Sequence, residues 1–280
     1  MDIPRIQYEA LVSAALAEDI GPGDITTALC IPEGTRATAT VLAKQPGVIA
    51  GLAIADLTFH LLDPDATWQA RVRDGDRVGE GRTMLATVTG DARALLTAER
   101  VALNFMQRLS GIATVTARYV GLVAGTDARI VDTRKTTPGL RALEKYAVRA
   151  GGGFNHRLGL YDCVLIKDNH IKAAGGIGNA VQAAKAHIPH TMKVEVEAST
   201  LAHVEEALRA GADIILLDNM ETETMRQAVT TIGGRAISEA SGGLTEARVA
   251  EVAATGVNVL SIGALTHSAP ALDISLDFAE

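Results

Sequence analysis

The stretch "MKVEVEASTLAHVEEALRAGADIILLD", residues 192–218, contains one complete strand–helix–strand pattern. Two short runs rich in β-branched and aliphatic residues, MKVEVE (192–197) and DIILLD (213–218), flank the helical segment LAHVEEALRAGA (201–212). Strands that alternate with helices are typical of parallel β/α units. The stretch therefore predicts one unit of an α/β fold.

The same pattern recurs through the second half of the chain. Further short apolar runs are ARIVD (128–132), CVLIK (163–167), RAISE (235–239) and VNVLSIG (257–263), and helical segments lie between most of them. Six or seven such units favour a barrel, complete or open, over a flat sheet. A doubly wound sheet is the alternative.

The first part of the chain has a different rhythm. A helical face runs from Tyr8 to Leu16 and stops at Gly21-Pro22-Gly23. Alternating segments at 36–43 and 68–90 predict strands, and a long helical pattern runs from Ala92 towards Val123. We predict an α+β domain over residues 1–108 and a β/α domain over 109–280, with room for about the last ten residues to pack back on the first domain.

Composition limits the classes of function. The formal charge of −7 argues against a general nucleic-acid binder, and two distant cysteines form neither a disulfide framework nor a zinc pattern. The N-terminus lacks the features of a signal peptide, and no apolar run approaches the roughly 20 residues of a membrane span. We expect a cytoplasmic protein that binds neither nucleic acid nor membrane.

Polar residues and glycines follow almost every predicted strand. The C-terminal face of a β/α barrel is where active sites are built, so these residues should converge. A cationic half comprises Arg134, Lys135, His156, Arg157 and Lys167, which suit carboxylates and phosphates. An anionic half comprises Glu197 and Asp218, which suit a divalent metal or a developing positive charge.

Glycines at two later strand ends predict a phosphate site. The segments SGGLTE (241–246) and IGAL (262–265) offer backbone N–H groups before helices. The expected ligand therefore has a carboxylate-rich part and a phosphorylated part. Taken singly, these residues have ordinary interpretations as well: Asp218 is a possible helix cap, and Arg141, Lys145 and Arg149 are expected to be solvated.

The sequence resembles the quinolinate phosphoribosyltransferase family over nearly its whole length. The matching segments are GDITT (23–27), ERVALNFMQRLSGIAT (99–114), DTRKTTPGLRALEKYAV (132–148), GGGFNHRLGLYD (151–162), LIKDNH (165–170), VEVE (194–197), LLDN (216–219), EASGG (239–243) and GALTHS (263–268). After VEVE the chain departs mildly from the family pattern, with Ala198 and Ser199 in place of an apolar residue and an acid.

The resemblance implies a fold and a reaction. The implied fold is an N-terminal α/β sandwich followed by an open, seven-stranded α/β barrel. The implied reaction joins quinolinate to phosphoribosyl pyrophosphate, releases pyrophosphate and CO₂, and gives nicotinate mononucleotide for NAD synthesis. It also implies Mg²⁺ as cofactor and an active homodimer or higher homo-oligomer with shared sites.

The resemblance also implies roles for individual residues. Lys135, Glu197 and Asp218 would be catalytic, and Glu197 and Asp218 would hold Mg²⁺, directly or indirectly. Quinolinate would be bound by Thr133, Arg134, Lys135, His156, Arg157 and Lys167, with Arg100 from a neighbouring subunit. Phosphoribosyl pyrophosphate would be bound by Lys135, Lys167, Glu197, Asp218, Asn219, Ser241, Gly242, Gly243, Gly263 and His267.

Three other functions stay open at this point. A paralogous branch found with molybdate transport genes shares much of the pattern. Lys167 at a strand end could form a Schiff base in an aldolase-like lyase. A non-enzymatic anion-binding module is the third alternative, but it would not need Glu197 and Asp218 beside the cations.

Overall fold

The computed structural model describes residues 3–279, and the chain forms two compact units. The first unit contains the chain up to Ala117, the segment Thr136–Gly152 and the chain from Thr266 onward, and the second contains Arg118–Lys135 and Gly153–Leu265. The boundary between residues 108 and 109 stays a prediction; the units themselves are interleaved along the chain.

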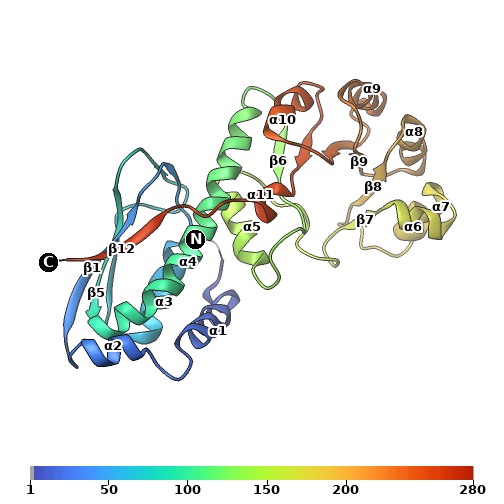
Figure 1. The fold of residues 1–280 in the computed structure, drawn as a ribbon. Coiled ribbons are helices and arrows are strands. Elements are labelled where there is room, and N and C mark those ends of the chain that lie inside the picture. Colours follow the sequence, from blue (N-terminus) through green and yellow to red (C-terminus); the bar gives the residue numbers. More distant parts are fainter. Residues whose placement is uncertain (1–2, 280) are drawn as a thin grey trace. The chain divides into compact units, whose positions relative to one another are not determined.

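The first unit is built on an antiparallel sheet with the strand order β12-β1-β5-β3 (Figure 1). The strands are β1 (Arg36–Ala43), β3 (Thr67–Ala70), β5 (Thr83–Asp91) and β12 (Ile274–Phe278), and a smaller sheet pairs β2 (Gly47–Val48) with β4 (Arg77–Val78). Strand β1 buries Ala39, Val41 and Ala43 in alternation, as its sequence predicts. The C-terminal strand β12 pairs with β1.

Helices cover this sheet and complete its core. Helices α3 (Leu52–Leu62) and α4 (Ala92–Leu122) contribute to this core. The unit also contains η1 (Arg5–Gln7), α1 (Glu9–Ile20), α2 (Ile25–Cys30) and α5 (Arg141–Ala150), whereas α4 and α11 (Ala264–His267) have residues in both units. Helix α1 ends at Gly21, whose φ is 50°, as the Gly-Pro-Gly break predicts. Phe59 of α3 and Met106 of α4 pack with Val41 and Leu85 of the sheet.

Helix α5 corrects one expectation from the sequence. Lys145 was expected to be solvated, but it is 1% exposed, and the neighbouring Glu144 is fully buried. Arg108 of α4 donates to Glu144 at 2.8 Å, and the backbone N–H of Thr137 donates to the same carboxylate at 3.1 Å. The spacing of residues along the helix could not predict that Glu144 and Lys145 are buried, because burial depends on residues from other parts of the chain, such as Arg108.

The second unit is an open parallel sheet with the strand order β6-β11-β10-β9-β8-β7. Its strands are β6 (Arg129–Val131), β7 (Val164–Ile166), β8 (Val194–Ala198), β9 (Ile214–Asp218), β10 (Ile237–Ser241) and β11 (Val259–Ser261). All six overlap runs predicted from the sequence, although β10 continues two residues beyond its predicted run, to Ser241. Val131 also forms a parallel bridge with Phe154, so within residues 3–279 this sheet has six strands and one isolated bridge, where the resemblance implied seven strands.

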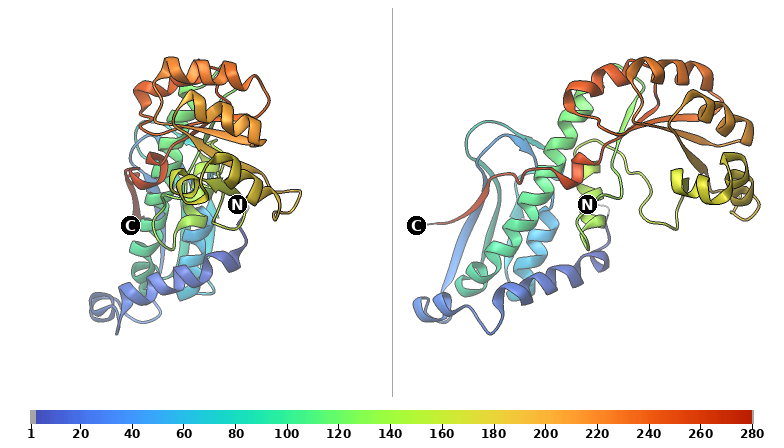
Figure 2. Two further views of the ribbon diagram at one scale, coloured as in Figure 1. Left: turned by 90° about the vertical axis from the view of Figure 1, so that its right-hand side faces the viewer. Right: turned by 45° about the vertical axis from the view of Figure 1, so that its right-hand side comes forward.

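Helices connect these strands and lie along the outer side of the curved sheet (Figure 2). They are α6 (Asp168–Ala174), α7 (Ile177–Lys185), α8 (Leu201–Ala210), α9 (Thr222–Ile232) and α10 (Glu246–Ala253). Because every pairing is parallel, all the strand C-termini meet at one edge. Among residues 3–279, no helix is both long enough and apolar enough to span a membrane.

Candidate active site

A cavity of about 540 Å³ opens at the C-terminal edge of the parallel sheet in the second unit. It is lined by Thr133, Arg134, Lys135, His156, Arg157, Leu165, Lys167, Leu216, Asp218, Asn219, Glu239, Ser241, Gly242, Gly243 and Ser261. Eleven of these were predicted as site residues from the sequence. The structure therefore brings most of the set together in one cavity, and their roles stay predictions.

The two-residue period of the strands explains which side chains reach the cavity. Lys167 directly follows β7, and Asp218 and Ser241 end β9 and β10. Two residues earlier, Leu165, Leu216 and Glu239 point to the same face and line the cavity at a deeper level. Parallel register aligns the neighbouring strands, with Ser241 beside Asp218 and Glu239 beside Leu216.

The cationic residues come from two loops that Asp132 joins. Thr133 to Lys135 follow β6, and His156 and Arg157 follow the Phe154 bridge. Asp132, which is fully buried, accepts hydrogen bonds from Asn155 Nδ2 at 2.6 Å and from the His156 backbone N–H at 2.9 Å. Arg157 Nη1 donates to the carbonyl of Cys163 at 3.1 Å. These bonds hold both loops at the edge of the sheet.

The two carboxylates predicted to act together lie on neighbouring strands. Glu197 is on β8 and Asp218 on β9, and the Glu197 Oε2 atom lies 3.7 Å from Lys167 Nζ. Partial burial raises the pKa of Glu197, the negative charge of Asp218 raises it further, and Lys167 opposes both effects. Glu197 does not line the cavity, but it is electrostatically coupled to two residues that do.

Beneath the cavity, His156 meets two glutamates. Its Nε2 atom lies 3.3 Å from Glu195 Oε2 and 3.3 Å from Glu239 Oε1, and both glutamates are buried. Burial lowers the pKa of His156, but the two neighbouring carboxylates outweigh burial and raise the pKa to about 10. The raised pKa alone would favour a doubly protonated ring, but the Arg157 backbone N–H donates to His156 Nδ1 at 2.7 Å, so Nδ1 is an acceptor and the ring carries its proton on Nε2.

The loops after β9 and β10 are in close contact. Asn219 has a φ of 53°, and its backbone N–H donates to the Ser241 carbonyl at 2.9 Å. Gly242 has a φ of 90°, and a Cβ atom there would lie 2.2 Å from Asn219 Oδ1. The glycine is therefore required both by backbone conformation and by space.

Three predicted residues lie elsewhere in the chain. Gly263 belongs to the second unit, beyond the end of β11, and is absent from the cavity lining. His267 and Arg100 belong to the first unit. Arg100 lines a separate cavity of about 340 Å³ with Gly23, Asp24, Thr26 and Thr97, among others.

Sequence reasoning missed four lining residues, namely Leu165, Leu216, Glu239 and Ser261. Glu239 was visible after the run RAIS but was not assigned a role. The signal that could have identified it is the strand period: Glu239 precedes the predicted Ser241 by two residues, as Leu216 precedes Asp218.

Comparison with known proteins agrees with this geometry. The family model for the quinolinate phosphoribosyl transferase N-terminal domain matches residues 24–110, and that for the C-terminal domain matches residues 112–277. The chain is 46% identical to a probable carboxylating nicotinate-nucleotide pyrophosphorylase of Bacillus subtilis over 98% of this chain and 94% of that protein. A Synechocystis protein described in the same words is 49% identical over 98% and 93%.

Solved structures agree as well. The nicotinate-nucleotide pyrophosphorylase from Francisella tularensis superposes with a TM-score of 0.95 at 40% identity, covering 99% of this chain and 98% of that one. These comparisons support neither the molybdate-associated paralogue nor the Schiff-base lyase. Relatives of this identity and coverage, together with matches to both domain models, place the chain in the quinolinate phosphoribosyltransferase family.

Proposed function

We propose that the chain is a carboxylating nicotinate-nucleotide pyrophosphorylase. It transfers the phosphoribosyl group of phosphoribosyl pyrophosphate to quinolinate and releases pyrophosphate and CO₂, leaving nicotinate mononucleotide for NAD synthesis. One observation carries the proposal: in a member of this family, a single cavity brings together Arg134, Lys135, Arg157 and Lys167 with Asp218 and a glycine loop.

The cationic side chains fit the dicarboxylate. Quinolinate carries two carboxylates on a small ring, and guanidinium groups pair with carboxylates through two parallel hydrogen bonds. We assign Arg134 and Arg157 to this pairing, with Lys135 and Lys167 supplying point charge. Thr133 and His156 line the same part of the site.

The phosphorylated substrate fits the opposite set of residues. The loop Ser241-Gly242-Gly243 offers backbone N–H groups for the 5′-phosphate, and Asn219 lies against it. Lys135, Lys167, Glu197 and Asp218 would contact the ribose and its pyrophosphate. Gly263 and His267 are assigned to the phosphate on the family resemblance alone.

Glu197 and Asp218 are suited to Mg²⁺. Their mutual repulsion, which contributes to the raised pKa of Glu197, is the electrostatic setting that a divalent cation relieves. Carboxylate oxygens are also the ligands that Mg²⁺ prefers. When bound, Mg²⁺ would supply positive charge for the departing pyrophosphate.

The chain's own residues carry the remaining chemistry by position and charge. Glu197 and Asp218 stabilise the electron-poor ribosyl centre as the bond to pyrophosphate breaks. The cations hold the quinolinate ring with its nitrogen towards that centre, which converts an encounter of two substrates into a step within one complex. Once ribosylated, the cationic ring stabilises the electron pair left on its carbon when CO₂ departs, and that carbon then takes up a proton from water, so no protein nucleophile is required.

We extend the proposal to assembly and location. The active form would be a homodimer or a higher homo-oligomer in which Arg100 reaches the site of a partner subunit. The protein would act in the cytoplasm on these small molecules, without binding nucleic acid or membrane.

A product assay tests the reaction. Purified protein is mixed with quinolinate, phosphoribosyl pyrophosphate and Mg²⁺, and the products are identified by mass spectrometry. We expect nicotinate mononucleotide with equal amounts of pyrophosphate and CO₂. Folded protein that makes no nucleotide, or that uses nicotinate and releases no CO₂, would overturn the proposal.

A further inference from the structure

The two buried glutamates beside His156, Glu195 and Glu239, have no part in the reaction as proposed so far. Glu195 is fully buried, and Glu239 is 4% exposed. Among residues 3–279, neither carboxylate oxygen of Glu195, nor Oε1 of Glu239, has a hydrogen-bond partner of ordinary geometry. What both carboxylates do meet is the imidazole of His156, 3.3 Å away in each case.

The position of these glutamates in the sheet makes their burial informative. Glu195 precedes Glu197 by two residues on β8, and Glu239 precedes Ser241 by two residues on β10. The parallel register places Glu195 beside Leu165 of β7 and Glu239 beside Leu216 of β9, and Leu165, Leu216 and Glu239 line the inner end of the substrate cavity. Such barrel layers are normally apolar, and a buried carboxylate is costly, so a purely structural role would favour leucine there.

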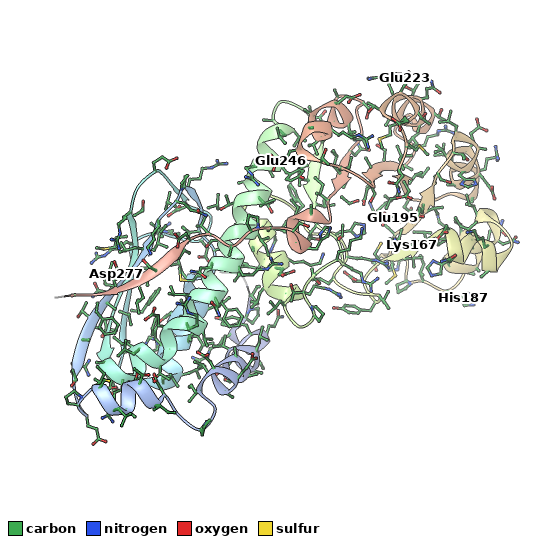
Figure 3. The ribbon with its side chains drawn as sticks, in the orientation of Figure 1. Lys167, His187, Glu195, Glu223, Glu246 and Asp277 are labelled. Atoms are coloured by element: carbon green, nitrogen blue, oxygen red, sulfur yellow. The ribbon has the colours of Figure 1, made fainter. Side chains whose placement is uncertain are left out.

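Figure 3 shows the contrast between Glu195 and ordinary surface acids. Glu223 and Glu246 lie on the outer helices α9 and α10, with side chains 71% and 47% exposed and arginine partners. Glu195 instead comes from β8, next to the edge strand β7 that Lys167 follows. Glu195 therefore interacts with buried neighbours inside the unit and not with solvent.

The ring of His156 links these glutamates to the substrate-binding loop. Its Nδ1 atom accepts the backbone N–H of Arg157, and its Nε2 atom faces the two carboxylates. Both nitrogens are thus engaged within the protein. The imidazole connects β8 and β10 directly to the residue whose guanidinium we assign to a quinolinate carboxylate.

We propose that Glu195 and Glu239 are positioning residues for quinolinate binding, which act through His156 to hold Arg157 in place. The inference rests on the proposed function. It gives His156 a supporting part in the dicarboxylate site, where the family resemblance implied direct contact. Removing either glutamate should loosen the ring, and with it the Arg157 loop, without touching the phosphate loop after β10.

A metal is the competing occupant of the cluster, since three ligand atoms lie within 4.8 Å of one another. A histidine bound to metal through Nε2 carries its proton on Nδ1 and donates it to an acceptor. Here the partner of Nδ1 is itself a donor, the Arg157 N–H. The geometry therefore favours a proton on Nε2 between ring and carboxylates.

Steady-state kinetics of four variants test the proposal. Glu195→Ala and Glu239→Ala should raise KM for quinolinate about tenfold to a hundredfold. The reason is that a shift of the Arg157 guanidinium by about 1 Å would weaken its pairing with the substrate carboxylate by that factor. Their KM for phosphoribosyl pyrophosphate should change less than about threefold. Glu195→Gln and Glu239→Gln keep an acceptor oxygen of the same reach, so they should recover most of the quinolinate affinity.

Ser238→Ala is the matched control. Ser238 precedes Glu239 on β10, is 2% exposed, and donates to Asn258 Oδ1 at 2.9 Å, away from the cavity. This variant should lose stability without a selective rise in KM for quinolinate. If the glutamine variants are as poor as the alanine variants, or if both substrates are affected equally, the positioning role is wrong. An inactive wild-type protein would instead refute the proposed reaction.

A measurement on the wild-type protein tests the proposal even if the alanine variants do not fold. In long-range proton–nitrogen NMR spectra of histidine-labelled protein, the ring signal that His156→Gln removes should show a proton on Nε2 and none on Nδ1. A proton on Nδ1 would overturn the proposal. So would stoichiometric metal in the purified protein that Glu195→Gln releases.

Discussion

At the scale of single residues, the cavity of the second unit combines four long cationic side chains with the carboxylate of Asp218. The cations suit the anionic groups of the two substrates. The carboxylate suits the positive charge that we expect to develop on the ribosyl centre during the reaction. Substituting each side chain can therefore show which of the two substrates it binds.

Arg134→Ala should weaken quinolinate binding far more than folding. A lost charged hydrogen bond is worth about 1.5–3 kcal/mol, or roughly tenfold to a hundredfold in affinity. Calorimetric titration with each substrate measures the effect. Arg141→Ala is the control, because Arg141 begins α5 in the first unit and donates to Thr136 Oγ1 at 3.0 Å, outside the cavity. Loss of phosphoribosyl pyrophosphate affinity alone would contradict the assignment.

Asp218→Asn should fold normally, bind quinolinate and turn over slowly. It keeps the size of the side chain but removes the charge that faces the ribosyl centre, and losses of this kind cost about 10²–10³ in kcat. A helix cap alone would cost about 1 kcal/mol of stability and little catalysis. Stability, kcat and the dependence of rate on Mg²⁺ separate the two roles. A stable variant with wild-type kcat and Mg²⁺ response would remove Asp218 from the mechanism.

At the scale of elements, the site depends on the loops that end parallel strands. The loop after β10 packs against the loop after β9 so closely that Asn219 occupies the place a side chain at residue 242 would need. The two loops therefore form one continuous edge, and if that edge binds phosphate as we propose, disturbing their contact should disturb binding.

Gly242→Ala should impair both stability and phosphoribosyl pyrophosphate binding. The left-handed conformation costs a non-glycine residue about 1–2 kcal/mol, and the new Cβ would in addition displace Asn219. Gly243→Ala is the matched variant: the φ of Gly243 is 57°, but a Cβ there would come no closer than 3.7 Å to a neighbouring group, Arg248 Nη1. Thermal melts and substrate titrations of both should show the larger loss for Gly242→Ala. Equal losses of stability and affinity in the two variants would mean that backbone strain alone, and not contact with Asn219, explains the effect.

At the scale of the whole molecule, the residues assigned to one reaction belong to both units. The cavity lies in the second unit, whereas Arg100 lies on α4 in the first, beside the loop that contains Asp24. A site completed by the Arg100 of a second copy of the chain is the assembly that we propose.

Mixed subunits test this assembly. If Arg100 serves a neighbour, inactive Arg100→Ala and Lys135→Ala chains should regain activity when mixed, because one site of a hybrid dimer then carries neither defect. In a two-site dimer with random exchange, about a quarter of all sites should be intact. Activity is measured after subunit exchange has been proved by mass spectrometry of the assembled protein. No recovery would place Arg100 in its own chain's site or outside any site.

The sequence by itself determined the parallel strands and most of the residues at their ends. All six strands of the second unit overlap short apolar runs, because strands covered on both faces need apolar residues almost continuously. The polar residues that follow them could be predicted to converge, since parallel strands end at one edge. These are local patterns, and local patterns can be read along a chain.

Only the tertiary structure determined which residues that are distant in sequence contact one another and which are buried. The pairing of β12 with β1, the burial of Lys145 on α5, and the junction of His156 with Glu195 and Glu239 each join residues far apart in sequence. Glu195 and Glu197 look alike in the run VEVE, yet one is sealed beneath the cavity and the other lies beside Lys167. The physical reason is that burial and charge pairing depend on which neighbours folding brings together, and spacing along the chain does not encode them.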